Sequence, residues 1–348
     1  MTSITTAFTR KFGLTHPFAQ AGMAFAGQKP ELTIAVSKAG GIGAIGVGFM
    51  PPEELRATIR TIRAAGVTMF NINFITIFGN DAQVQVAAEE KVPVVSFHWG
   101  HPPAEQIATL KAAGCSIWVQ VGTVADAETA IGYGAEVIIA QGHEAGGHNY
   151  QGIGGSDQPG MGGIALIPVM ADAIAGRALL LAAGGIADGR GVAAALALGA
   201  DGVWVGTRLV ASAEAYVHPE HHRRLVEAQG TDTTLSGVFG PEMPFFNPMR
   251  LHKSRVVQEW NHRLAEVPTL RDDLEVIGET VFMGGKHIKR KFDVILPTED
   301  TTGDFEEMAW LMGQGVGLVK DIRPAGEIVA TMMAEAVQVL QNRAASIQ

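Results

Sequence analysis

The sequence repeats one short phrase, in which a polar helix end and small residues are followed by a glycine and an apolar run. Glycine just beyond a helix adopts the left-handed conformation at little steric cost, so the chain can turn directly into the next segment. Apolar runs with little alternation are typical of parallel strands buried on both faces. The phrase therefore predicts a succession of helix–strand units. It occurs at residues 38–42, 63–67, 111–115, 132–137 and 197–203.

Eight short apolar segments precede residue 206, and most begin roughly 20 to 27 residues after the one before. This spacing is the period of a βα unit and predicts an α/β fold of the (β/α)8 type, a TIM barrel. An open doubly wound sheet is the alternative, although it does not require eight evenly spaced units. The expected strands are 18–21, 43–47, 69–74, 92–97, 117–121, 137–140, 179–183 and 203–205.

Two stretches interrupt the period. The first is a glycine-rich loop at 141–163, and the part from 151 onward has no assigned role. The second follows the last strand and contains no clear βα unit, so we expect an inserted helical cap domain there. The expected domains are a barrel at 1–212, a cap at 213–313 with helices at 218–228 and 249–264, and a C-terminal segment at 314–348 that returns to the barrel with a helix at 324–344.

Composition excludes several classes of protein. The 348 residues carry a net charge of −9, and without a basic cluster a nucleic-acid partner is not expected. Cys115 is the single cysteine, so no internal disulfide can form, and no closely spaced Cys/His pairs indicate a metal site. Neither a secretory signal nor a membrane segment is evident. We therefore expect a cytoplasmic protein with no membrane partner.

In a barrel of this kind the chemistry lies at the C-terminal ends of the strands. The sixth strand leads into the octet Gln141-Gly-His-Glu-Ala-Gly-Gly-His148, where paired glycines allow a ligand close to the backbone and a histidine can exchange a proton. Gly184-Gly185 and Gly206-Thr207 follow the seventh and eighth strands. Because the loops after these strands form the usual phosphate site of the barrel, we expect a phosphate-bearing ligand.

These residues resemble the nitronate monooxygenase family, formerly called 2-nitropropane dioxygenases, and a close variant of the octet occurs in the FMN-dependent enoyl-acyl-carrier-protein reductases. The octet is the specific part of the resemblance, and the weaker pieces follow in family order over nearly the whole chain. Departures are Gly22, where the family often has proline, and Asn149-Tyr150, where it often has Arg-Gly. The weaker pieces are residues 20–23, 39–43, 71–73, 95–97, 183–186, 206–208 and 312–315.

The resemblance implies a non-covalent FMN and assigns a role to each candidate residue. His148 would be the catalytic residue, which removes the α-proton of a neutral nitroalkane or holds the nitronate oxygens. The phosphate would lie at Gly184, Gly185, Gly206 and Thr207. The rest of the flavin would contact Met23, Asn73, Gln120, Gln141, Gly146 and Gly147, and Gln314 would reach it from the C-terminal segment. No metal is implied.

The activity that the resemblance implies is oxidative denitrification, in which a nitronate or nitroalkane and O2 give a carbonyl compound and nitrite. An FMN-dependent reductase that uses NAD(P)H on quinones or enoyl thioesters stays open, because both chemistries need a flavin and a nearby acid or base. A catalytically silent flavin-binding protein is the alternative from another class. The physiological substrate, the use of NAD(P)H and the formation of a homodimer are not decided by the sequence.

Overall fold

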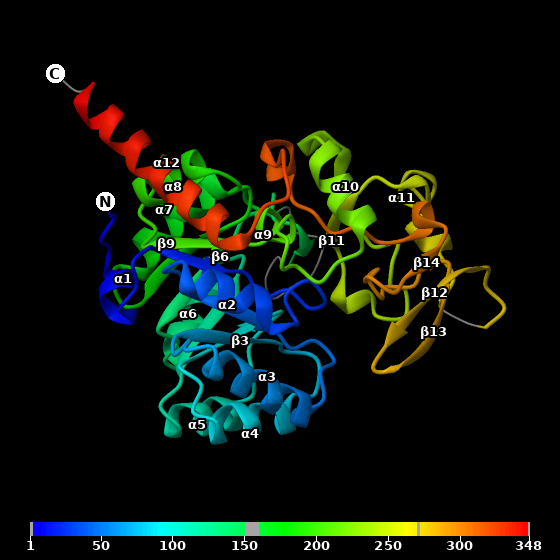
Figure 1. Ribbon diagram of the computed structural model, residues 1–348, viewed down its shortest axis with the longest axis horizontal. Helices are drawn as coiled ribbons and strands as arrows, with labels where there is room; N and C mark the ends of the chain where they lie inside the picture. Colours follow the sequence, from blue (N-terminus) through cyan, green and yellow to red (C-terminus); the bar gives the residue numbers. More distant parts are fainter. Residues whose placement is uncertain (1–2, 150–159, 270–271, 347–348) are drawn as a thin grey trace.

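The computed structural model describes residues 3–149, 160–269 and 272–346. Most of the glycine-rich stretch at 151–163 therefore lies outside the described residues. Within them, a parallel sheet wrapped by helices occupies one side of the molecule and a smaller mixed unit occupies the other (Figure 1). The two units meet at the C-terminal ends of the parallel strands.

The eight parallel strands appear where the apolar runs predict them, in the order β1-β9-β8-β6-β5-β4-β3-β2. The amide of Gln20 donates to the carbonyl of Ile42, and that of Ile42 donates to Phe18, so β1 also meets β2 and the barrel closes. The predicted (β/α)8 barrel is thus confirmed. The strands are β1 Phe18–Gln20, β2 Gly43–Gly46, β3 Phe70–Ile75, β4 Val94–His98, β5 Ser116–Val121, β6 Val137–Gln141, β8 Leu179–Ala183 and β9 Gly202–Val205.

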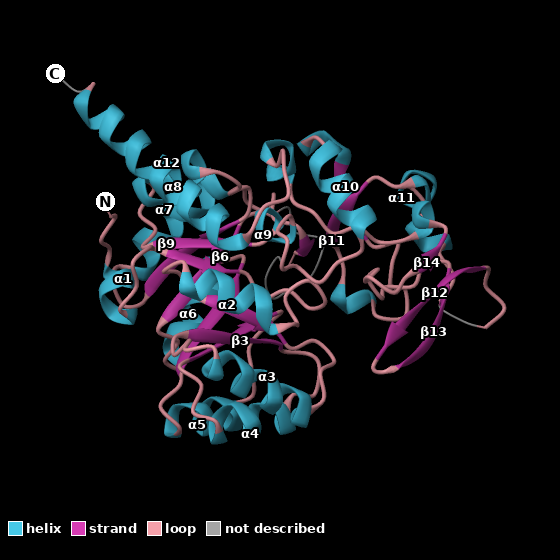
Figure 2. Cartoon of the chain, in the orientation of Figure 1, coloured by secondary structure: helices cyan, strands magenta, loops and turns pink. Residues whose placement is uncertain are grey.

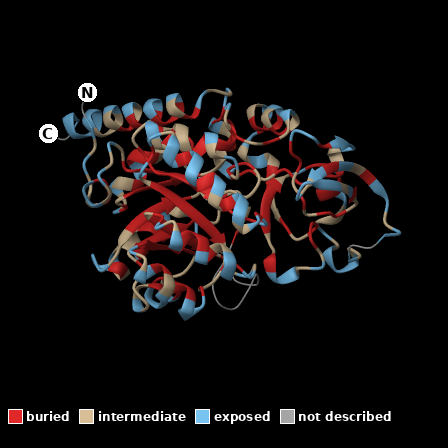
Figure 3. Cartoon of the chain, turned by 60° about the horizontal axis from the view of Figure 1, so that its bottom comes forward, coloured by how far each residue is buried: buried red, intermediate tan, exposed pale blue. Residues whose placement is uncertain are grey.

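Helices cover the outside of the barrel, and buried strands fill its centre (Figure 3). The glycines that follow several of these helices have positive φ, for example Gly66 at 82° and Gly114 at 84°, as the repeated phrase predicts. The long α12 packs against α8 and α2 and takes the place of the eighth barrel helix. The barrel helices are α2 Pro30–Lys38, α3 Pro52–Ala64, α4 Asp81–Glu89, α5 Ala104–Ala112, α6 Val124–Gly132, α7 Gly163–Ile174, α8 Gly189–Ala197, α9 Thr207–Val210 and α12 Ala325–Ala345, with α1 Ala7–Phe12 before β1.

The cap contains strands as well as helices, so the expectation of a helical cap is wrong in that respect (Figure 2). The expected helix at 218–228 is present as α10, but the one at 249–264 is replaced by a strand and a shorter helix. That strand pairs with remote segments, which local sequence does not reveal. The cap elements are α10 Pro219–Glu227, β10 Thr233–Ser236, β11 Met249–His252, α11 Arg255–Trp260, β12 Val276–Phe282, β13 Gly285–Arg290 and β14 Thr302–Gly303, with short 3-10 turns between them.

The cap is joined to the barrel by a small sheet. Its strand β11 pairs with β10 on one side and, on the other, with β7 (Gly147–His148), which belongs to the loop after β6. In this register Met249 faces His148 and Arg250 faces Gly147. The end of the octet is therefore held between the two units, directly above the barrel mouth.

Candidate active site

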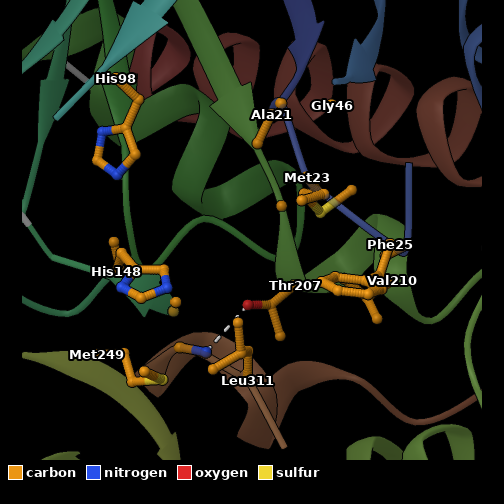
Figure 4. Close-up of a pocket in the computed structure, with 18 of the residues that line it drawn as sticks. Ala21, Met23, Phe25, Gly46, His98, His148, Thr207, Val210, Met249 and Leu311 are labelled. Atoms are coloured by element: carbon orange, nitrogen blue, oxygen red, sulfur yellow. Dashed lines mark hydrogen bonds between the residues drawn. The ribbon is translucent and has the colours of Figure 1, made fainter. Parts of the chain in front are cut away.

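A deep cavity opens at the C-terminal ends of the barrel strands, under the cap. Residues from all eight barrel strands or from the loops that follow them line its barrel side, and Met249 and Leu311 approach from the cap side. Figure 4 shows His98 and His148 on one side of this cavity and Met23 and Phe25 on the other. The position agrees with the rule that barrel chemistry lies at the C-terminal strand ends.

The imidazole of His148 is held in one tautomer. Its Nδ1 lies 2.7 Å from the carbonyl oxygen of Phe246. Because a carbonyl only accepts hydrogen bonds, Nδ1 carries the proton and Nε2 keeps its lone pair. Burial lowers the pKa of His148 to about 3, although the bond to Phe246 opposes this shift and nearby His98 adds to it. His148 is therefore neutral near pH 7, with Nε2 available as a base.

The ring of His148 is also fixed by packing. It stacks on the phenyl ring of Phe246 with centroids 3.5 Å apart and planes 22° apart, and Trp99 meets it edge-on at 5.8 Å. The same Phe246 thus supplies a carbonyl to one ring nitrogen and a face to the ring. Such support from a neighbouring residue keeps a catalytic side chain in one orientation.

A second histidine, His98, ends β4 and lines the same cavity. Burial lowers the pKa of His98 to about 4, and a hydrogen bond to the backbone of His148 opposes the shift. Its Nδ1 is buried without a hydrogen-bond partner among the described residues. An unpaired buried nitrogen is costly to the folded state, which marks this part of the cavity wall as strained in its polar contacts.

The octet itself is held by buried polar groups. The amide of Gln141 donates to the carbonyl of His148 at 3.0 Å, and Asn149 Nδ2 lies 3.3 to 3.4 Å from the carbonyls of three octet residues. From the cap, the buried guanidinium of Arg250 donates to the carbonyl of His143 at 3.1 Å. Asn149, which departs from the family pattern, therefore helps to hold the catalytic loop.

Gly146 is required by a close approach of two backbones. A Cβ at this position would lie 2.5 Å from the amide nitrogen of Gly313, and a Cβ at Gly313 would lie 2.8 Å from that of Gly146. Such distances are too short for real side chains. The glycine of the octet thus lets the chain that returns from the cap cross over the loop after β6.

The glycines after β8 and β9 leave backbone open to the cavity. Gly184 and Gly185 have φ of 102° and 73°, which L side chains rarely adopt. Gly206 has an ordinary φ of −109°, and a Cβ there would meet only Ala21 at 3.5 Å and Met23 at 3.7 Å. The two strands are neighbours in the sheet, so these residues form one cradle of exposed backbone that fits a phosphate.

Three amide side chains face the cavity, and they belong to Asn73 on β3, Gln120 on β5 and Gln141 on β6. Asn73 is anchored, since its Nδ2 donates to Ser96 Oγ at 2.8 Å. Gln120 is buried and lines the cavity, and its side-chain amide makes no hydrogen bond with any described residue. The side-chain amide of Gln120 is therefore free to hydrogen-bond a polar group of a ligand. The cap residues Met249 and Leu311, in contrast, are apolar.

The structure brings together all the predicted site residues except Gln314. Gln314 donates its backbone amide to the carbonyl of Glu144 at 2.9 Å, and it lines a separate shallow pocket with His143 and Leu318. Its neighbours Gly313 and Gly315 do line the main cavity. The residues that meet there are Met23, Asn73, Gln120, Gln141, Gly146, Gly147, His148, Gly184, Gly185, Gly206 and Thr207.

Sequence reasoning missed some residues of the cavity wall. His98 directly ends β4, so the rule that located the other candidates could have included it. The aromatic and methionine residues of the cap indicate packing against the barrel more strongly than a substrate wall, yet Phe246 and Met249 line the cavity, and Leu311 joins them from the segment that returns from the cap. Phe245, in contrast, is 62% exposed and its carbonyl accepts a hydrogen bond from Trp99. Phe246 is the aromatic residue of this turn that lines the cavity.

Among residues 3–149, 160–269 and 272–346, no group of three His, Cys, Asp or Glu side chains could hold a metal ion. No helix in these ranges is long and apolar enough to cross a membrane. Cys115 is buried near the start of β5, and burial raises the pKa of its thiol to about 11, so it is far from a reactive thiolate.

The fold and the cavity define the class: a (β/α)8-barrel enzyme whose C-terminal mouth is covered by an inserted cap. The nitronate monooxygenase profile matches residues 5–80 and 71–335. The chain belongs to this family of oxidoreductases.

Individual relatives differ in their described activities. A probable nitronate monooxygenase of Bacillus subtilis is 32% identical over 266 residues, which cover 67% of this chain and 76% of the relative. A nitronate monooxygenase of Pseudomonas aeruginosa is 28% identical and the match covers 95% of this chain and 99% of the relative. Among solved structures, FabK from Thermotoga maritima superposes with a TM-score of 0.78 at 31% identity over 99% of this chain and 100% of that one. A nitroalkane oxidase from Streptomyces ansochromogenes gives 0.77 at 27% identity, over 97% and 99%.

Proposed function

We propose that this protein is an FMN-dependent enzyme that oxidises nitroalkanes and their nitronates with O2 to carbonyl compounds and nitrite. The observation that carries the proposal is the neutral His148, with Nδ1 bonded to a carbonyl and Nε2 unprotonated, in a cavity that ends in a glycine cradle. Family membership supports the same chemistry. In overall balance, two nitronates and one O2 give two carbonyl compounds and two nitrite ions.

The residues of the cavity fit FMN. Gly184, Gly185, Gly206 and Thr207 would hold its phosphate, because they expose backbone at adjacent strand ends. Gln120 offers a polar side-chain amide along the barrel side. Bound FMN supplies the redox chemistry, since it can take electrons from a nitronate and pass them to oxygen.

His148 would act first as a base and then as a donor. Its Nε2 accepts the α-proton of a neutral nitroalkane, and the resulting Nε2–H then donates to a nitronate oxygen. The cation that forms next to the anionic nitronate is less costly than an isolated one in a buried site. Before that proton transfer Nε2 cannot donate, which favours the base role over simple binding of a nitronate.

The lining of the cavity favours a small substrate over a phosphate-rich one. The described residues that line it include no Asp, Glu, Lys or Arg side chain. Apart from the FMN phosphate, which the backbone of the glycine cradle would hold, a phosphate of NAD(P)H or of an acyl thioester carrier would therefore have no cationic partner inside the cavity. A reductase remains the second candidate because FabK is as similar to this chain as the nitronate monooxygenases are.

One paired experiment separates the two candidates. Oxygen uptake and nitrite release are measured with propyl nitronate in air, and NADH oxidation is measured anaerobically with menadione or crotonyl thioester. The proposal expects nitrite in the first assay without added NAD(P)H. Anaerobic NADH turnover with no nitrite in air would reverse the assignment.

A further inference from the structure

The cap supplies one continuous apolar wall to the cavity. Val294, Ile295, Leu296 and Pro297 follow one another after β13, and all four line the cavity. Phe25, Phe49 and Phe78, from loops after the barrel strands, line it too. This part of the cavity offers a substrate apolar surface, whereas the amides of Gln120 and Gln141 belong to the barrel side.

The wall is fixed by a buried ion pair on the cap. Lys289 is fully buried, and its Nζ donates to the carbonyl oxygen of Ile295 and lies 3.6 Å from Asp293 Oδ2. Asp293 is 2% exposed, and its Oδ1 accepts the backbone amide of Ile295 at 2.8 Å. Both backbone polar groups of one wall residue are therefore held by this pair.

A buried ion pair stabilises a turn only against a large unfavourable free energy of desolvation. Removing each charge from water is unfavourable. A protein with such a pair is often no more stable than one with apolar residues in place of both partners. Burial lowers the pKa of Lys289, and Asp293 opposes that shift. His287 Nε2 lies 2.6 Å from the same carboxylate, so Asp293 has a further partner. What the pair does achieve is a partner for both backbone polar groups of Ile295, in the segment beside the cavity.

The hairpin that carries Lys289 is also tied to the barrel. Phe282, at the end of β12, packs against Phe25 with ring centroids 6.2 Å apart and against Phe49 at 5.5 Å. The wall therefore keeps its position relative to the barrel loops that form the other apolar surface. The β12–β13 hairpin lies at the far edge of the cap in Figure 1.

We propose that residues 294–297 bind the apolar chain of the substrate and limit its length, and that Lys289 is the positioning residue for this wall. The substrate class is then a nitronate that carries an apolar chain. This inference rests on the proposed function and specifies which nitronates the site accepts.

The test uses the FMN-loaded protein and nitronates of primary nitroalkanes from nitroethane to nitrooctane. Burial of one methylene corresponds to about a fourfold gain, so kcat/KM rises by about that factor per carbon until the wall is reached. In Leu296→Trp the larger side chain fills part of the cavity beside the wall, so two or three methylenes of a long substrate lose their binding site. The ratio of kcat/KM for nitrohexane to that for nitroethane is expected to fall by about tenfold or more. A ratio equal to that of the wild type would overturn the proposal.

Lys289→Met tests the positioning role, with Lys286→Met as its matched control on the exposed face of the same strand. Lys289→Met is expected to flatten the dependence on chain length through KM for the longer substrates, with a smaller effect on kcat. Lys286→Met keeps the wild-type ratio. If Lys289→Met lowers kcat for every chain length alike, Lys289 has only a structural role and the positioning claim fails.

Binding of unreactive n-alkyl carboxylates provides a readout that does not need turnover. Their dissociation constants are measured by calorimetry on the FMN-loaded wild type and Leu296→Trp. An affinity that rises with chain length in the wild type and levels off earlier in the variant supports the wall even if no nitronate is oxidised. Affinities that do not depend on chain length would contradict the wall whatever the reaction is.

Discussion

At the scale of single residues, the chemistry depends on which nitrogen of His148 carries the proton. The carbonyl of Phe246 places that proton on Nδ1, and burial keeps the ring neutral. A histidine of ordinary pKa would be partly protonated near neutral pH and so partly lost as a base. The ring therefore stays neutral over the whole physiological range, and a nitronate anion formed beside it would stabilise its protonated form.

Replacing His148 tests this role directly. His148→Asn is expected to retain FMN while losing turnover on neutral nitroalkanes by about 10²- to 10⁴-fold, the usual contribution of a general base. Flavin content is read from the visible spectrum and turnover from nitrite release. His262→Asn, at an exposed position of the cap, is the control. Unchanged rates in His148→Asn would remove this residue from the mechanism.

Gly206 tests the phosphate cradle without disturbing the fold. A Cβ there makes ordinary contacts and φ is negative, so Gly206→Ala is expected to fold normally. The added methyl group lies toward Ala21 and Met23, which line the cavity, and should weaken FMN binding about tenfold or more, as measured by quenching of flavin fluorescence. Gly132→Ala, at the exposed end of α6 where a Cβ meets nothing, is the matched control. Equal FMN affinity in both variants would place the phosphate elsewhere.

At the scale of elements, the catalytic loop is shared between the barrel and the cap. Strand β7 carries His148 but obtains its partner, β11, from a segment about a hundred residues later. The segment that returns from the cap is held to the barrel in a similar way, because Thr207 Oγ1 accepts a hydrogen bond from the backbone amide of Gly313 at 3.0 Å (Figure 4). The cap therefore builds the site rather than only covering it.

Thr207 allows this fastening to be tested. Thr207→Val keeps the shape but leaves the amide of Gly313 without its acceptor, which costs about 1–3 kcal/mol where the group stays buried. We expect a lower urea midpoint and weaker FMN binding. Thr207→Ser keeps the oxygen and should restore most of both. Were the serine variant as impaired as the valine one, the hydrogen bond would not be the cause.

At the scale of the whole molecule, three cavity histidines make the stability depend on pH. Burial lowers the pKa of His98 and of His221 to about 4 and that of His148 to about 3, from 6.5. The unfolded chain therefore binds more protons between about pH 6.5 and pH 4, so the free energy of unfolding falls as the pH falls through this window. Each group contributes up to about 1.4 kcal/mol per pH unit there.

Urea unfolding at pH 7 and pH 5 measures this dependence. The wild type is expected to lose stability at the lower pH, and His221→Gln, which keeps a donor toward the carbonyl of Leu311, should lose less. His262→Asn serves again as the exposed control and should follow the wild type. A His221→Gln slope identical to that of the wild type would show that His221 is not buried as a neutral group.

The barrel could be predicted from the sequence because its signals are local. Each glycine that ends a helix and each apolar run lies within one βα unit, and the strands appear at those positions. The cap could not be predicted in the same way. Residues 249–252 form a strand only because β7 and β10 provide partners, and Phe246 reaches His148 only through the same folding. These contacts join residues that lie far apart in the sequence, so no local sequence pattern indicates them.

The central claim is tested most directly by the stoichiometry of one reaction in air. The FMN-loaded protein is mixed with propyl nitronate, without any nicotinamide, and nitrite and consumed O2 are measured together. The account predicts two nitrite ions for each O2 consumed, with the corresponding aldehyde as product. No nitrite above that of a protein-free control, with the flavin fully bound, would contradict it.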